Sequence, residues 1–113
     1  LDLAVVSPAA RARQTWALVA AELDVPPPTQ VEEAAYTFDG EDLFAVVGGL
    51  PESARVVALV GHNPAVEDFV QTVTGRYAAL PTSAIAVVEV PEWGSVGPGT
   101  GRLVANLRPA DEA

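Results

Sequence analysis

Three observations predict an α/β fold, with helices packed on the faces of a sheet. Short runs of apolar residues alternate along the chain with segments whose apolar residues recur at helical spacing. Two of these runs are followed at once by residues that start a helix, and such strand–helix alternation is typical of α/β sheets. The chain has 113 residues, of which 50% are hydrophobic, so we expect one compact domain with a buried core.

The first strand and the first helix are predicted within residues 1–23. Residues 1–6 form an apolar run typical of a buried strand. Ser7 and Pro8 follow, and they fit the N-cap and the first turn of a helix over residues 9–23. Four apolar residues of this helix share one face and should turn toward the core: Ala12, Trp16, Val19 and Leu23. Three consecutive prolines then end the helix.

The later elements continue the alternation. Residues 31–38 fit a loop with a short extended piece, and residues 91–101 form a loop rich in glycine and proline. The further strands are expected over residues 56–60, 84–90 and 102–107, and the further helices over residues 39–49 and 65–75. The tail, residues 109–113, is expected to fray.

Charge and composition exclude several classes of function. The net charge is −9, from 15 acidic against 6 basic residues, and every basic residue is arginine. Such a surface repels nucleic acid and anionic lipid, so neither is an expected partner. The absence of cysteine excludes disulfides, thiol nucleophiles and thiolate metal sites. No signal peptide or membrane-spanning stretch is present, and we expect a soluble, cytoplasmic protein.

Both strand-to-helix junctions carry a residue suited to binding an anion. Arg11 lies in the first turn of its predicted helix, and His62 follows the strand over residues 56–60 after a single glycine. In open α/β sheets, ligands bind at the carboxyl ends of the strands. Helix N-termini add partial positive charge and free N–H groups there, and a guanidinium can grip two phosphoryl oxygens. The two junctions together predict a phosphate site.

Less specific interpretations of these residues stay open at this point. Arg11 and Arg13 also fit solvated charges, although a cation in the first helical turn opposes the helix dipole. Arg13 lies about 200° around the helix from Arg11, so only one of them can face the pocket. His62 is the only histidine of the chain, and a single histidine is often a structural residue. The residues alone therefore indicate an anion-binding α/β domain.

Three sequence blocks carry a family resemblance. They read SPAARARQT at residues 7–15, VGHNP at residues 60–64 and LPTSAIAV at residues 80–87. In order and spacing they resemble the Ser-Pro-x-x-Arg-Ala-x-Gln-Thr block, the second-histidine block and the following strand entry of the histidine phosphatase (phosphoglycerate mutase-like) superfamily. The similarity is greatest to the bacterial phosphohistidine phosphatases of the SixA type. It covers nearly the whole chain and implies a three-layer α/β/α fold with a mostly parallel sheet.

The resemblance also implies roles for individual residues. Arg11 would bind phosphoryl oxygens, and His62 would be the second pocket histidine, stabilising charge in the transition state. Asn63 and Ser83 are further candidates for phosphate contacts, and Glu33 is the candidate general acid. With two arginines and two histidines in the family's pocket, no metal or other cofactor is implied.

One part of the family's pattern is missing from the sequence. The family's nucleophile is a histidine in an Arg-His-Gly motif after the first strand, and no Arg-His-Gly occurs here. The chain also has no methionine, even at position 1. We therefore expect residues 1–113 to be the C-terminal part of a single histidine phosphatase domain, without the N-terminal strand and helix, and expect this chain alone to be inactive.

Several other polar or aromatic residues fit ordinary structural roles. Thr82 opens a strand, where a hydroxyl usually serves a turn. Residues 97–101 look like a phosphate loop but precede a strand rather than a helix, so we interpret them as a hairpin connection. Trp93 is interpreted as a packing residue.

The leading hypothesis is a phosphatase that acts on phosphohistidine in a protein, or on a small phosphomonoester, through a phosphohistidine intermediate. A non-catalytic phosphate-binding module is the alternative that the missing nucleophile favours. A phosphoglycerate mutase-like enzyme is a third possibility, although no insertion shapes a pocket for a sugar phosphate.

Overall fold

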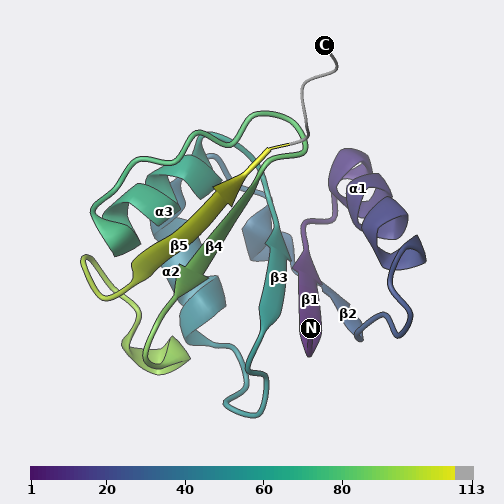
Figure 1. The fold of residues 1–113 in the computed structure, drawn as a ribbon, viewed down its shortest axis with the longest axis horizontal. Coiled ribbons are helices and arrows are strands. Elements are labelled where there is room, and N and C mark those ends of the chain that lie inside the picture. The colour runs from purple at the N-terminus through teal and green to yellow at the C-terminus, as the bar shows by residue number, and fades with distance from the viewer. Residues whose placement is uncertain (109–113) are drawn as a thin grey trace.

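The structure alternates strands with helices, as the sequence predicts. A computed structural model describes residues 1–108 (Figure 1), and the tail expected to fray lies outside these residues. The strands are β1 (Leu3–Val6), β2 (Thr29–Val31), β3 (Val57–Val60), β4 (Ile85–Glu89) and β5 (Arg102–Leu107). The helices are α1 (Ala10–Ala21), α2 (Gly40–Gly48) and α3 (Ala65–Thr74), with short 3-10 turns η1 (Glu33–Ala35) and η2 (Trp93–Ser95).

Two separate sheets are formed. The first has three parallel strands in the order β2-β1-β3, and β1 in the middle pairs with both neighbours. The second is an antiparallel pair, β4 with β5, that starts from Ile85 opposite Leu107. The expected α/β class and its parallel sheet are confirmed, and the last strand pairs back on its predecessor as predicted. Within residues 1–108 no ladder joins β3 to β4.

Helix α1 covers one face of the parallel sheet. Ala4 and Val6 of β1 are buried against Ala12 and Trp16 of the helix, and the Trp16 indole donates a hydrogen bond to Thr29 Oγ1 at 2.9 Å. The expected core stripe holds for these two helical residues and for Leu23, which packs against the cluster. The prediction of a buried side chain is wrong for Val19, which is 43% exposed. The sheet beneath this part of α1 ends in β2, a short strand that is itself exposed.

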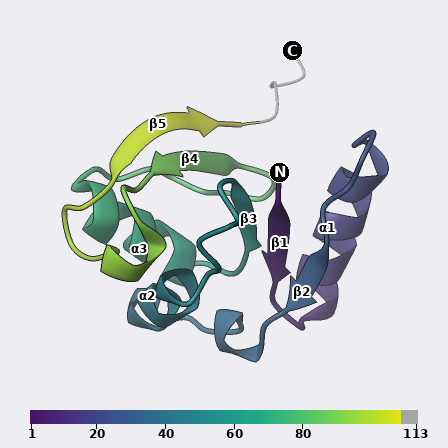
Figure 2. The same cartoon turned by 90° about the horizontal axis from the view of Figure 1, so that it is seen from below.

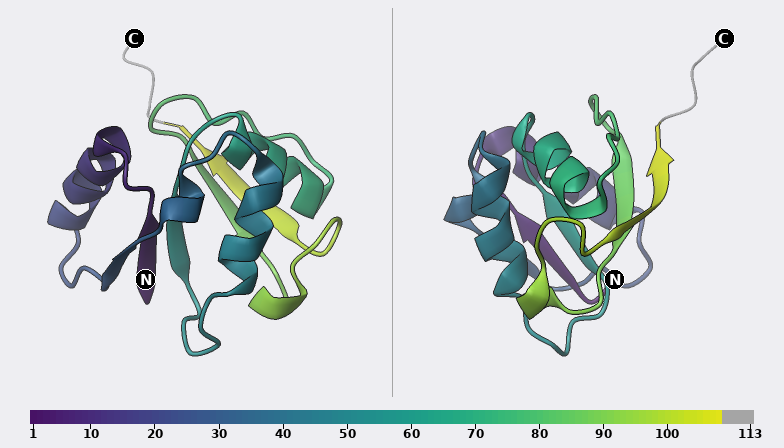
Figure 3. Two further views of the ribbon diagram at one scale, coloured as in Figure 1. Left: turned by 180° about the vertical axis from the view of Figure 1, so that it is seen from behind. Right: turned by 90° about the vertical axis from the view of Figure 1, so that its left-hand side faces the viewer.

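Helices α2 and α3 form the third layer, on the other side of the sheet from α1 (Figure 2). Asp39 caps α2 by accepting the Glu41 N–H, and Gly75 ends α3 with a left-handed φ of 73°. Both ends agree with the predicted bounds to within one residue. The two helices meet through an edge-on pair of rings, Phe44 and Phe69, with centroids 5.0 Å apart. Figure 3 shows α3 between α2 and the strands β4 and β5.

Backbone hydrogen bonds connect the glycine-rich loop between β4 and β5 to helix α3. Gly99 N–H donates to Thr72 O at 2.9 Å, and Gly101 N–H donates to Val73 O at 3.0 Å. The Trp93 indole donates to Ala54 O at 2.7 Å. The antiparallel pairing of β4 with β5 confirms that this loop is a hairpin connection, and the partly buried Trp93 contacts the segment before β3. No helix within residues 1–108 is long and apolar enough to cross a bilayer.

Candidate functional site

The carboxyl ends of β1 and β3 bring Ser7 and His62 together. Val6 and Val60 are partners in the parallel ladder, so the residues that follow them leave the sheet at the same end, which is the upper end in Figure 1. Ser7 N–H donates to Val60 O at 3.0 Å. The Ser7 hydroxyl then lies 2.7 Å from Nε2 of His62. His62 therefore lies at the end of a strand, as the sequence predicts, and its polar partner is Ser7, which follows the neighbouring strand.

Ser7 has a different role from the predicted one. The helix begins at Ala10, its N-cap is Ala9, and that cap has no side-chain hydrogen bond. Ser7 is fully buried, and its hydroxyl accepts the Ala9 N–H at 3.3 Å while it contacts His62. The prediction of Ser7 as N-cap is wrong because the chain needs two more residues to turn from strand to helix. The sequence feature that could have indicated the contact with His62 is the position of Ser7 directly after β1. That position indicates a neighbour of His62 only when the pairing of β1 with β3 is known.

Tyr36 is the third member of this group, and the sequence did not single it out. It follows η1 at the carboxyl end of β2. Its ring lies against the imidazole of His62, with centroids 5.2 Å apart and planes tilted by 39°. The ambiguous segment over residues 31–38 therefore supplies an aromatic wall beside His62. The segments that follow the three strands of the parallel sheet each contribute one residue to this cluster, which consists of Ser7, Tyr36 and His62.

Arg11 lies in the first turn of α1, four residues after Ser7. Its side chain is exposed, and the first turn of α1 holds no acid. Within residues 1–108 the one ion pair joins Arg102 to Glu89, so Arg11 forms no ion pair with the described carboxylates. Arg13 is exposed as well. Arg11 and His62 lie at the same end of the sheet, and no hydrogen bond joins their side chains in the described part of the chain.

Two acidic residues follow β2 at this end of the sheet. Glu32 uses its carboxylate to cap η1, accepting the Ala34 N–H at 3.3 Å. Glu33, the predicted general acid, is exposed in η1, and its carboxylate makes no hydrogen bond to the part of the chain that is described. Of the two, Glu33 has the side chain that remains available to a ligand. Its role as general acid stays a prediction.

Asn63 and Glu67 fasten the segment before β4 to α3. The Asn63 amide donates to Leu80 O at 2.6 Å and to the Glu67 carboxylate at 3.3 Å. Glu67 in turn accepts the Leu80 N–H at 2.6 Å. Both amide hydrogens of Asn63 thus have acceptors inside the protein, which gives this residue a structural task next to His62. Its predicted phosphate contact remains a prediction.

The two hydroxyl residues just before β4 are exposed. Ser83 adopts a left-handed φ of 67°, which is uncommon for a residue other than glycine. Thr82 precedes it in the same turn. This turn geometry agrees with the interpretation of Thr82 as a turn residue, and the phosphate contact of Ser83 stays a prediction.

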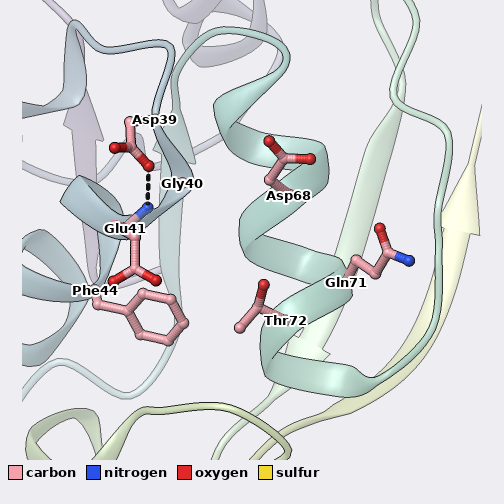
Figure 4. Close-up of a pocket in the computed structure, with 7 residues that line it drawn as sticks. All are labelled: Asp39, Gly40, Glu41, Phe44, Asp68, Gln71 and Thr72. Carbon is pink, nitrogen blue, oxygen red and sulfur yellow. Dashed lines mark hydrogen bonds between the residues drawn. The ribbon is translucent and has the colours of Figure 1, made fainter.

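A depression of about 270 Å³ lies between α2 and α3, and none of the three cluster residues lines it (Figure 4). Three carboxylates line it, those of Asp39, Glu41 and Asp68, together with Gly40, Phe44, Gln71 and Thr72. A phosphate group would be repelled by these acids. The acids therefore make this depression an unfavourable place for an anion.

Comparison with known proteins identifies the fold. No protein-family model matches the sequence, and no curated protein matches it. Among solved structures, a protein from Nakamurella multipartitia assigned as the phosphohistidine phosphatase SixA superposes with a TM-score of 0.84 at 20% identity, over 98% of this chain and 72% of that chain.

Two further solved structures agree with this result. The protein histidine phosphatase SixA in complex with tungstate gives a TM-score of 0.79 at 27% identity, over 95% of this chain and 68% of its own. A protein from Agrobacterium tumefaciens assigned as SixA gives 0.74 at 25% identity, over 96% and 68%. The order of elements, the parallel sheet and these three superpositions lead to one conclusion: the chain has the fold of the SixA-type histidine phosphatases.

Proposed function

We propose that the chain is the C-terminal part of a phosphatase domain that hydrolyses phosphohistidine in a protein, or a small phosphomonoester, through a phosphohistidine intermediate. The observation that carries the proposal is the pairing of Ser7 with His62 at the carboxyl ends of two parallel strands, beside the arginine-bearing first turn of α1. The SixA neighbour bound to tungstate supports it, because tungstate is a tetrahedral oxyanion like phosphate.

In this proposal the described residues bind and stabilise the phosphoryl group. Arg11 offers a planar, permanently charged fork to two phosphoryl oxygens, and the N-terminus of α1 adds free N–H groups. His62 donates a hydrogen bond to an oxygen whose charge grows in the transition state. A local cluster of this kind lets a chain of net charge −9 attract an anion.

The nucleophile is proposed to lie outside residues 1–113. His62 is the only histidine of the sequence and is already held between Ser7 and Tyr36. A phosphohistidine intermediate needs a second histidine in line with the phosphoryl group. The 113-residue chain alone is therefore expected to bind phosphate and to lack hydrolytic turnover.

A non-catalytic phosphate-binding module is the second candidate. The observation that favours it is the same single histidine, because binding requires Arg11 and His62 whereas hydrolysis requires a nucleophile as well. The two candidates differ in one measurable property. The module binds phosphate without turnover in every form of the protein, including the product of the complete reading frame.

Hydrolysis by the product of the complete reading frame tests the proposal. We expect it to hydrolyse p-nitrophenyl phosphate and a phosphohistidine-bearing protein, and expect His62→Ala to lower kcat by about 10²–10³-fold, as the loss of one donor to a developing charge does. Gln71→Ala, an exposed change on α3, is the matched control and should keep full activity. Equal rates for wild type and His62→Ala would remove His62 from the mechanism, and binding without any hydrolysis would favour the module.

A further inference from the structure

We infer that Ser7 is a positioning residue that holds neutral His62 with its proton on Nδ1, so that the imidazole meets a phosphoryl group as a hydrogen-bond donor through Nδ1. The phosphoryl contact rests on the proposed function. The position of the proton rests on the geometry around Ser7 alone.

The Ser7 hydroxyl has one available acceptor. Ser7 is fully buried, and its Oγ has two polar neighbours in the described part of the chain. One is the Ala9 N–H, a donor 3.3 Å away, and the other is Nε2 of His62 at 2.7 Å. A buried O–H that donates to nothing loses its hydrogen bond to water without replacement. The Ser7 O–H therefore donates to Nε2.

This bond fixes which nitrogen of His62 carries the proton. A neutral imidazole has one N–H donor and one acceptor nitrogen, so a ring that accepts at Nε2 is protonated at Nδ1. Nδ1 has no protein partner within residues 1–108, and no buried polar side-chain atom there lacks a partner. Nδ1 must therefore be open to solvent, and it is the nitrogen left for a ligand.

The opposite arrangement fails on two counts. If Nε2–H donated to Ser7 Oγ, the buried Ser7 proton would have no acceptor among the residues described. Nδ1 would then present a lone pair to the negatively charged oxygens of a phosphoryl group, which repel it. The Tyr36 ring beside the imidazole further restricts the orientations that His62 can adopt.

Nitrogen-15 NMR of the imidazole tests the inference directly, because His62 is the only histidine of the 113-residue chain. The spectrum is taken at about pH 9, where imidazole groups are ordinarily neutral. We expect Nδ1 to resonate as a protonated, pyrrole-type nitrogen and Nε2 as an unprotonated, pyridine-type one. The reverse assignment in the wild-type chain would overturn the inference without any variant.

Variants then connect the proton to Ser7. Ser7→Ala should abolish the preference for Nδ1–H and weaken the binding of inorganic phosphate by about tenfold, the effect of losing one net hydrogen bond. Ser53→Ala, an exposed change in a turn, is the matched control and should leave both unchanged. A tautomer that survives Ser7→Ala would contradict the role given to Ser7.

Phosphate titration separates this inference from the proposed function. In the wild-type chain, inorganic phosphate should shift Nδ1 and its proton more than Nε2, and a shift confined to Nε2 would overturn the inference. If Nδ1 is protonated but phosphate does not shift its resonance, the positioning role of Ser7 is supported and the proposed phosphate function is contradicted.

Discussion

Gly101 occupies a position with no room for a side chain. A Cβ built there would lie 2.5 Å from Val73 Cγ1 and 3.0 Å from Glu89 O. Position 101 is where the chain enters β5 and is bonded to α3 through Val73 O. Even one methyl group at this point must therefore displace α3 or the β4–β5 pair.

Gly101→Ala is accordingly expected to lower the free energy of unfolding by about 1–3 kcal/mol, the usual cost of overpacking. Gly94→Ala is the matched control, because a Cβ at position 94 meets no atom within 4 Å. We expect the control to change stability by less than about 0.5 kcal/mol. Urea unfolding of the two variants measures the difference, and equal stabilities would show that the space around Gly101 yields easily.

At this scale the sequence predicted the positions of some residues at this end of the sheet and missed others, for a physical reason. Arg11 and His62 could be predicted because each follows a strand, and the end of a strand is visible in the hydrophobic pattern. Ser7 and Tyr36 could not, because their contacts with His62 depend on which strands are neighbours. Ser7 and His62 are 55 positions apart in the sequence, and no local pattern encodes that distance.

At the scale of secondary structure, Asp2 links the start of β1 to the chain entering β3. Its carboxylate accepts the N–H groups of Arg55 and Val56 at 2.8 and 2.9 Å. These backbone hydrogen bonds, first that of Val56 and then that of Arg55, lower the pKa of Asp2 below its ordinary value of 3.8. These bonds favour the charged form of the Asp2 carboxyl group, so the folded chain favours that form more than the unfolded chain does.

This lowered pKa makes a testable prediction for stability against pH. A carboxyl group whose pKa is lower in the folded than in the unfolded state stabilises the fold above the unfolded value, here 3.8, and loses that effect as pH falls through the folded value. Asp2→Asn should therefore reduce stability at neutral pH, and the difference from wild type should shrink below pH 3.8. Urea unfolding at several pH values measures this, and a difference that stays constant down to low pH would contradict the role given to the charge.

Most elements, but not their pairing, were predictable. The predicted helices and strands agree with the structure to within about two residues at most ends, because caps, prolines and glycines mark them. Asp39 and Gly75 are clear instances at the start of α2 and the end of α3. The short strand β2 was not predicted at residues 29–31, since three exposed residues carry no hydrophobic alternation.

At the scale of the whole molecule, charge opposes folding. The net charge is −9, and the one ion pair within residues 1–108, Arg102 with Glu89, is exposed. Like charges repel one another more strongly in the compact state, and salt screens that repulsion. We expect the thermal midpoint at neutral pH to rise when sodium chloride is raised from about 0.05 to about 0.5 M, a range over which screening strengthens markedly. Choline chloride of the same ionic strength should give the same rise, and a fall with both salts would contradict this account.

The layered architecture was predictable, whereas the division into two sheets was not. Alternating strands and helices predict layers, and the structure has α1 on one side of the parallel sheet and α2 and α3 on the other (Figure 2). Which strands share hydrogen bonds depends on partners distant in the sequence. The separation of β4 and β5 from the parallel sheet therefore became visible only in three dimensions.

Binding of tungstate to the 113-residue chain, followed on the imidazole resonances of His62, tests most directly whether Arg11 and His62 serve one tetrahedral anion. We expect the His62 resonances to shift and to saturate as tungstate is added. Arg11→Ala should weaken the affinity for tungstate by about tenfold or more, because a charged hydrogen bond is lost. Arg13→Ala should leave the affinity for tungstate unchanged. Shifts that are absent, or equal losses for the two arginine variants, would contradict this account.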